Sequence, residues 1–116
     1  MTNQKNSAYL RFLNLIDVLD RINPGRKLDA TEESLLNKIV LSSYQGETVL
    51  VGDLISLSEL GSQATLHGRL KNLRALGFIE MAADADGRKK HVVPTKMAVK
   101  RYEEMSKCLE KAVRTA

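Results

Sequence analysis

Apolar residues recur at helical spacing over most of this chain. Between Ser7 and Ile22 they cover more than half of a helix circumference and leave only a narrow polar stripe. The sequence Asn23-Pro24-Gly25 then predicts the end of the helix, because proline cannot continue the hydrogen-bond ladder. We expect a helix with so broad an apolar surface to be buried on several sides.

A second helix is predicted from about Ala30 to Ser43. Asp29 is a suitable N-cap, and Glu32 three residues later completes a capping box. The spacing of the apolar residues is typical of a core helix. Its inner face is expected to hold Leu35, Leu36, Ile39 and Val40, with Tyr44 as a further candidate.

A shorter helix follows this core helix. Thr48 and Val49 are predicted to form a short strand, and the segment from Leu50 to Leu57 carries leucines at helical spacing. Ser58-Glu59-Leu60-Gly61 is then the turn that leads to the next helix.

The next helix has an apolar side and a basic side. Ser62 is a suitable N-cap for it. Leucines at positions i, i+4 and i+7 are expected to face inward: Leu66, Leu70 and Leu73. The residues expected to face solvent are Gln63, Thr65, His67, Arg69, Lys71 and Arg74.

A hairpin is predicted after this helix. Gly77 is expected to end the helix in a left-handed conformation, and a strand begins at residues 78–81. The chain turns at Asp84-Ala85-Asp86-Gly87 and returns through residues 91–93. The residues beside the hairpin tip are cationic: Arg88, Lys89 and Lys90.

The last predicted element is a helix with a narrow apolar seam. Pro94 ends the strand and Thr95 is a suitable cap. Apolar residues then alternate at spacings of four and three, which favours packing against another helix: Ala98, Tyr102, Met105, Leu109 and Ala112.

The order of helix, turn, basic helix and hairpin predicts a winged helix-turn-helix, a mainly α fold with a small β-hairpin wing. With 116 residues, a single domain over residues 1–116 is expected. Its core is expected at about residues 29–95. The helices at about residues 7–22 and 95–114 have excess apolar surface, and we interpret them as dimerisation helices that pair across a two-fold axis. The alternative is that both helices pack on their own domain.

The start of the basic helix carries side chains that can contact base edges in a major groove. Gln63 can donate and accept at adenine, while Thr65 and His67 can bond to a base or a phosphate. Arg69 and Lys71 are better suited to clamp phosphates, and Arg69 is also a candidate for reading guanine.

The hairpin tip offers a second contact with nucleic acid. Arg88 is the best candidate to enter the narrow, electronegative minor groove, with Lys89 and Lys90 on the flanking phosphates. A basic patch alone is more often a solvated surface, but its combination with the helix, turn and hairpin favours DNA binding.

This part of the chain resembles the multiple-antibiotic-resistance regulator (MarR) family. The resemblance covers roughly residues 29–98 and is carried by Ser62-Gln63-Ala64-Thr65-Leu66-His67, Leu73, Gly77-Phe78-Ile79-Glu80 and Asp84-Ala85-Asp86-Gly87-Arg88. It implies a winged-helix dimer that represses or activates transcription, with Arg88 as the wing arginine and Asp86 as the acidic residue that orients it. It also implies that Ser62, Gln63, Thr65 and His67 occupy recognition-helix positions.

Other function classes find little support. The sequence has no nucleophile, base and orienting residue in a recognisable set, so we expect no enzyme and no catalytic residue. The two histidines, His67 and His91, lack the spacing of a metal site, and no cofactor is predicted. Cys108 next to Lys107 is either a somewhat acidified redox switch or an inert thiol, and the inert thiol is favoured because no second cysteine is present.

The composition is compatible with a polyanionic partner, since the net charge is +4 at pH 7 and the pI is about 9.3. Residues 1–6 lack the apolar segment of a signal peptide, so we expect a cytoplasmic protein without membrane contact.

The hypothesis is therefore a homodimeric, sequence-specific regulator that binds double-stranded DNA at a pseudo-palindromic operator. The rival is a winged-helix adaptor for protein partners, and the sequence leaves open whether a small-molecule effector exists.

Overall fold

The computed structural model describes residues 7–84 and 86–114, so Ala85 of the wing motif and the N-terminal residues 1–6 lie outside the described part. The chain divides into two compact units. One contains Asp29–Val99, and the other combines the described residues up to Leu28 with those from Lys100 onward. No helix in the described residues is long and apolar enough to cross a membrane.

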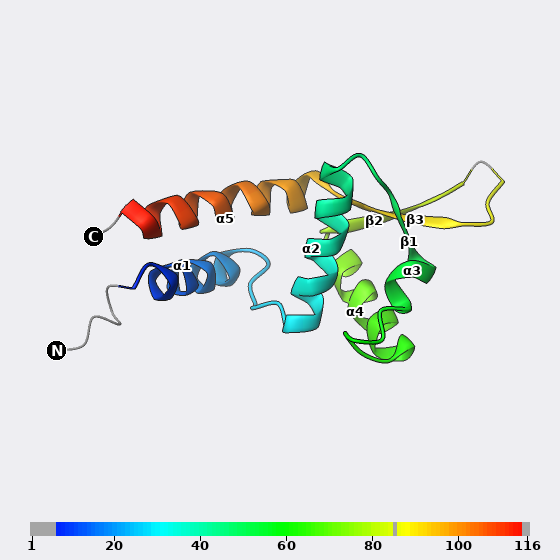
Figure 1. The fold of residues 1–116 in the computed structure, drawn as a ribbon, viewed down its shortest axis with the longest axis horizontal. Coiled ribbons are helices and arrows are strands. Elements are labelled where there is room, and N and C mark those ends of the chain that lie inside the picture. The colour runs from blue at the N-terminus through cyan, green and yellow to red at the C-terminus, as the bar shows by residue number, and fades with distance from the viewer. Residues whose placement is uncertain (1–6, 85, 115–116) are drawn as a thin grey trace. The chain divides into compact units, whose positions relative to one another are not determined.

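Helix α2 (Ala30–Tyr44) is the scaffold of the 29–99 unit. The predicted capping box is present: the Asp29 carboxylate accepts from the backbone N–H of Glu32, and the Glu32 carboxylate accepts from that of Asp29. Leu35, Leu36 and Ile39 are fully buried where α2 packs on α4 and β3 (Figure 1). The expectation for Tyr44 is wrong, since it is 88% exposed. It is the last residue of α2, beyond the turns that carry the buried residues.

Strand β1 (Val49–Leu50) runs directly into α3 (Val51–Ile55), and a turn leads from there to α4 (Gln63–Ala75). Helix α3 is shorter than the predicted 50–57 segment. The Ser56 hydroxyl donates to the carbonyl of Gly52 at 2.7 Å and closes the last turn. Leu54 is the one fully buried residue of α3, and it anchors this helix against the core.

Helix α4 ends as the sequence predicts. Gly77 has a φ of +86°, which favours glycine, and its N–H donates to Arg74 O at 3.0 Å. The N–H of Phe78 donates to Leu73 O at 3.0 Å, which completes a Schellman motif. The chain therefore reverses within two residues and places Phe78, which is 1% exposed, in the core.

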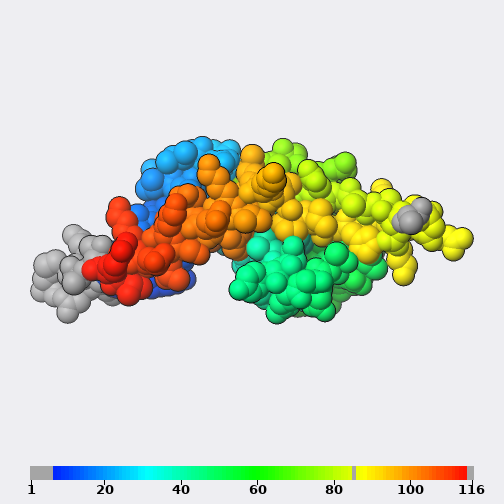
Figure 2. Space-filling view, turned by 90° about the horizontal axis from the view of Figure 1, so that it is seen from above, coloured from blue at the N-terminus to red at the C-terminus, as the bar shows by residue number. Residues whose placement is uncertain are grey.

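The wing is an antiparallel hairpin of β2 (Ile79–Ala83) and β3 (Lys90–Pro94), and β1 joins β3 on its other side to give the order β1-β3-β2. Val92 pairs with both Val49 and Met81 and is 2% exposed, so the sheet is fixed to the core at its centre. The far end of the hairpin projects from the rest of this unit as a narrow arm (Figure 2).

The second unit pairs α1 (Ala8–Ile22) with the part of α5 (Lys96–Arg114) that belongs to it. The helices run antiparallel: the Arg11 guanidinium donates to the carbonyl of Ala112 at 2.7 and 3.0 Å, and Asp20 forms a buried ion pair with Arg101. Ile16 and Asp20 are the buried residues of α1. Its large exposed apolar side chains are Tyr9, Leu10, Leu13, Val18 and Ile22, so the single chain does not bury the helix on several sides as expected.

Helix α5 begins at the predicted cap. The Thr95 hydroxyl accepts from the N–H of Ala98 at 3.2 Å and donates to the carbonyl of Gly77 at 2.6 Å. The same threonine thus starts α5 and ties it to the end of α4 within the 29–99 unit.

Candidate nucleic-acid interface

Helix α4 separates its apolar and polar sides cleanly. Leu66, Leu70 and Leu73 are at most 1% exposed and hold the helix on the core through contacts with α2, α3 and β2. The opposite side is open to solvent, as the spacing predicts. Its exposed polar residues include the predicted contacts Gln63, Thr65, His67 and Lys71, together with Arg74.

The first turn of α4 is organised by two hydroxyls. Ser62 Oγ accepts from the N–H of Thr65 at 3.2 Å and donates to Thr65 Oγ1 at 3.0 Å. The Ser62 hydroxyl is therefore engaged as a cap, whereas the Thr65 hydroxyl keeps its own proton for a further acceptor. The first turn contains no acidic residue, so the partial positive charge of the helix N-terminus is not neutralised there.

Two polar residues on one flank of α4 contact the capping box of α2. Arg69 Nε lies 2.7 Å from Asp29 Oδ2, and Asn72 Nδ2 donates to Glu32 Oε2 at 3.1 Å. The prediction that Arg69 clamps phosphate or reads guanine therefore concerns a side chain that already has an acidic partner. The sequence showed Asp29 and Glu32 as a capping box but gave no signal of these contacts with α4.

The middle of the exposed side of α4 is occupied by small residues that the sequence prediction did not single out. Ala64 and Gly68 are four residues apart and lie opposite the buried leucines. A Cβ at Gly68 would meet no atom within 4 Å, so packing does not require glycine there. Glycine inside a helix costs about 1 kcal/mol relative to alanine, and no close packing around Gly68 offsets that cost.

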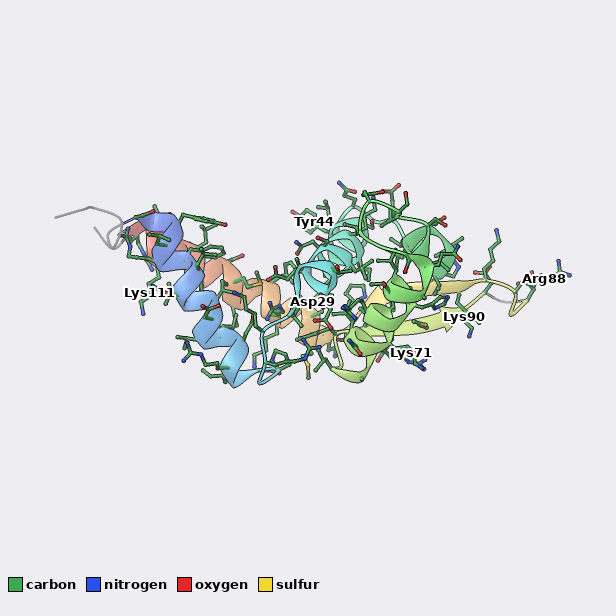
Figure 3. The ribbon with its side chains drawn as sticks, turned by 90° about the horizontal axis from the view of Figure 1, so that it is seen from below. Asp29, Tyr44, Lys71, Arg88, Lys90 and Lys111 are labelled. Atoms are coloured by element: carbon green, nitrogen blue, oxygen red, sulfur yellow. The ribbon has the colours of Figure 1, made fainter. Side chains whose placement is uncertain are left out.

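The wing presents its cations at the tip. The Arg88 side chain is 85% exposed, its backbone N–H donates to Asp86 Oδ1 at 3.1 Å, and its Nε lies 3.8 Å from Asp86 Oδ2. This geometry fits the orienting role predicted for Asp86. Lys89 and Lys90 are exposed behind it, and Figure 3 shows Arg88 at the end of the wing, Lys90 nearer its base and Lys71 on α4.

The turn side of the β2–β3 pair holds a set of linked polar side chains that sequence reasoning missed. His91 on β3 is bonded through Nε2 to Asp84 Oδ1, and its Nδ1 lies 3.1 Å from Thr48 Oγ1. Ala82 pairs with His91, which brings the residue after β2 within reach of the imidazole. One histidine thus links the segment before β1, strand β3 and the turn of the wing.

Cys108 lies half-buried in the unit that contains α1. Burial raises the pKa of its thiol above the ordinary value of 9.0, and Glu104 acts in the same direction, whereas Lys111 opposes them. Lys107, the residue considered as an acidifying neighbour, instead lies with its Nζ 3.4 Å from Glu104 Oε1. These contacts favour the inert thiol.

We expect slow alkylation of Cys108 by iodoacetamide. Because the thiolate is the reactive form and the pKa is raised, the rate at about pH 8 should be lower in the folded protein than in urea. The rate of the folded protein should still rise as the pH passes 9.0. A folded protein that reacts faster than the unfolded chain near neutral pH would contradict this prediction.

The elements of the 29–99 unit define the winged helix-turn-helix class: helix α2, strand β1, the pair α3 and α4, and the hairpin β2–β3. Solved structures of transcription regulators share this fold. A MepR variant from Staphylococcus aureus bound to an oligodeoxyribonucleotide superposes with a TM-score of 0.69 at 17% identity, over 96% of this chain and 74% of that one.

Other regulators match in the same way. BpsR of Bordetella bronchiseptica, described by the regulation of its DNA binding by 6-hydroxynicotinic acid, gives a TM-score of 0.54 at 22% identity, over 92% of this chain and 71% of that one. A MarR protein from Peptoclostridium difficile gives 0.57 at 18% identity, over 92% and 64% of the two chains. No family model and no curated protein matches the sequence. The chain therefore has the fold of the MarR-family regulators, which confirms the predicted fold.

Proposed function

We propose that this protein is a sequence-specific, double-stranded DNA-binding regulator of transcription that acts as a homodimer on a pseudo-palindromic site. The observation that carries the proposal is the exposed side of α4, which stands opposite its buried leucines and belongs to the same compact unit as the cationic wing. A helix presented in this way fits a major groove about 12 Å wide.

The chemistry of α4 supports a role in reading bases. Gln63, Thr65 and His67 are exposed in its first turns, where helix-turn-helix proteins contact base edges. Lys71 follows one turn later as a phosphate contact. The small side chains of Ala64 and Gly68 let the helix backbone approach the groove closely.

The wing supports a second contact. Arg88 extends from the end of a hairpin that is fixed at its base, so a guanidinium is available for a minor groove or a phosphate. Lys89 and Lys90 add two positive charges beside it.

The unit that contains α1 supports the homodimer. Large apolar side chains that remain exposed on it include Tyr9, Val18, Ile22, Leu109 and Val113. Single exposed apolar side chains are normal on a protein surface, but several large ones on one unit indicate a surface that binds another protein. In a two-fold symmetric dimer, the same residues of a second copy would cover this surface.

The test is selection from a pool of random-sequence duplexes, followed by a salt titration of the selected duplex and by sedimentation of the free protein. A dimer that enriches a two-fold symmetric sequence would support the proposal. A folded protein that binds no duplex at low salt would overturn it and favour the adaptor function.

Replacing Arg88 by alanine should weaken binding to selected and random duplexes alike. The slope of log K against log salt concentration should flatten by about one unit for each interaction with a phosphate that the substitution removes. Lys38→Ala is the matched control, because it removes a positive charge from an exposed position on α2. If the Arg88→Ala and Lys38→Ala variants bind DNA with the same affinity and the same salt slope, the wing takes no part in DNA binding.

A further inference from the structure

The capping box of α2 uses only half of its carboxylate oxygens for α2 itself. Asp29 Oδ1 accepts from the N–H of Glu32 at 2.7 Å, and Glu32 Oε1 accepts from the N–H of Asp29 at 2.9 Å. The second oxygen of each carboxylate contacts α4: Asp29 Oδ2 lies 2.7 Å from Arg69 Nε, and Glu32 Oε2 accepts from Asn72 Nδ2 at 3.1 Å. Figure 3 shows Asp29 beside α4.

We infer that this capping box sets the orientation of α4, so that Arg69 and Asn72 are positioning residues of the recognition helix. The inference rests on the proposed function, since it assigns these residues a part in DNA recognition. It gives Arg69 a role other than the predicted phosphate or guanine contact.

The two contacts restrain rotation and sliding of α4, which the apolar contacts of the core restrain only weakly. Leu66, Leu70 and Leu73 hold α4 through apolar contacts, which have no preferred direction. Arg69 and Asn72 are three residues apart and therefore lie on one flank of the helix, one turn from each other. The Asn72–Glu32 hydrogen bond at one level of this flank and the Arg69–Asp29 ion pair at the other oppose both rotation about the helix axis and sliding along it.

A small rotation is enough to affect base contacts. Turning α4 by about 15° moves an atom about 6 Å from its axis by roughly 1.5 Å. That displacement exceeds the range of hydrogen-bond lengths, which spans only about 0.5 Å. Thr65 lies on the same flank, one turn before Arg69, so its position depends most directly on the two contacts.

The two contacts differ in burial. Glu32 is 1% exposed, so its carboxylate depends on the donors around it. The side chains of Arg69 and Asp29 are 37% and 45% exposed, and pairs this open add little to stability. The Asp29–Arg69 pair can therefore be removed to test orientation with little change in folding.

Asp29→Asn is the decisive variant, because asparagine caps a helix as well as aspartate does but cannot form the ion pair with Arg69. Glu47→Gln is the control: it removes a negative charge from an exposed position of the same unit. Asn72→Ala tests the second contact.

The first measurement needs no DNA. Hydrogen exchange of the α4 amides should be faster in Asp29→Asn and Asn72→Ala than in wild type, and unchanged in Glu47→Gln. Unchanged exchange in both test variants would overturn the inference even if the wild-type protein binds DNA.

The second measurement uses the duplex selected by the wild-type protein and a scrambled duplex of the same composition. For Asp29→Asn, the ratio of the two affinities should fall about tenfold, as expected when one hydrogen-bonded base is no longer read, with an unchanged salt slope. A change in the folded fraction alone would alter both affinities equally. Tighter binding to both duplexes with a steeper slope would show that Arg69 is a phosphate contact and would overturn the inference.

The outcomes for the two proposals are separable. A wild-type protein that binds no duplex contradicts the proposed function, whereas the exchange of the α4 amides still reports whether the capping box holds that helix.

Discussion

Replacing Arg101 by alanine is expected to lower the free energy of unfolding by about 3–5 kcal/mol. The side chains of Arg101 and Asp20 are 4% and 1% exposed, so the substitution leaves an aspartate charge buried without its partner. Urea denaturation at a fixed protein concentration measures the effect, with concentration held constant because association would shift the transition.

The double variant Asp20→Leu/Arg101→Met should be as stable as the wild type or more stable. Asp20 Oδ2 is buried without a hydrogen-bond partner in the described structure, so the pair does not fully compensate its desolvation. Lys107→Ala, which removes an exposed partner of Glu104, is the control and should change stability by less than about 0.5 kcal/mol. A cost below about 1 kcal/mol for Arg101→Ala would mean that water reaches the pair.

Truncating Phe78 to alanine is the second change with a large expected effect, a loss of about 3–5 kcal/mol in the free energy of unfolding. Phe78 is 1% exposed and follows the Schellman turn that ends α4, so its ring fills the core at the start of the wing. Phe78→Leu should cost less than half as much, because leucine keeps most of the apolar volume. Equal losses in the free energy of unfolding for the two variants would mean that the aromatic ring itself, and not its apolar volume, stabilises the core.

The parts of the fold that the sequence predicts correctly depend on local chemistry. Asp29 and Glu32 form their capping box, Gly77 ends α4 with a positive φ, and Thr95 caps α5. Each feature involves residues within a few positions of each other, so the spacing alone specifies the partners. The leucines of α4 are equally predictable, because helical periodicity determines which side is buried.

The features that sequence reasoning missed depend on distant partners. The ion pair of Asp29 with Arg69 and the hydrogen bonds of Glu32 with Asn72 and of His91 with Asp84 join different elements or the two sides of the hairpin. Their formation depends on packing angles and strand register, which a single sequence does not specify. The roles of Ser62, Gln63, Thr65, His67, Lys71, Arg88, Lys89 and Lys90 in DNA binding remain predictions.

The division of α4 into a leucine side and an exposed side has a consequence for how such a protein evolves. Folding depends on Leu66, Leu70 and Leu73, whereas Gln63, Thr65 and His67 contribute little to the core. Under the proposed function, substitutions at the exposed positions change the preferred DNA sequence while the chain stays folded. New target sequences are therefore accessible by single mutations without a compensating change elsewhere, and the same positions suit a randomised library from which new DNA preferences are selected.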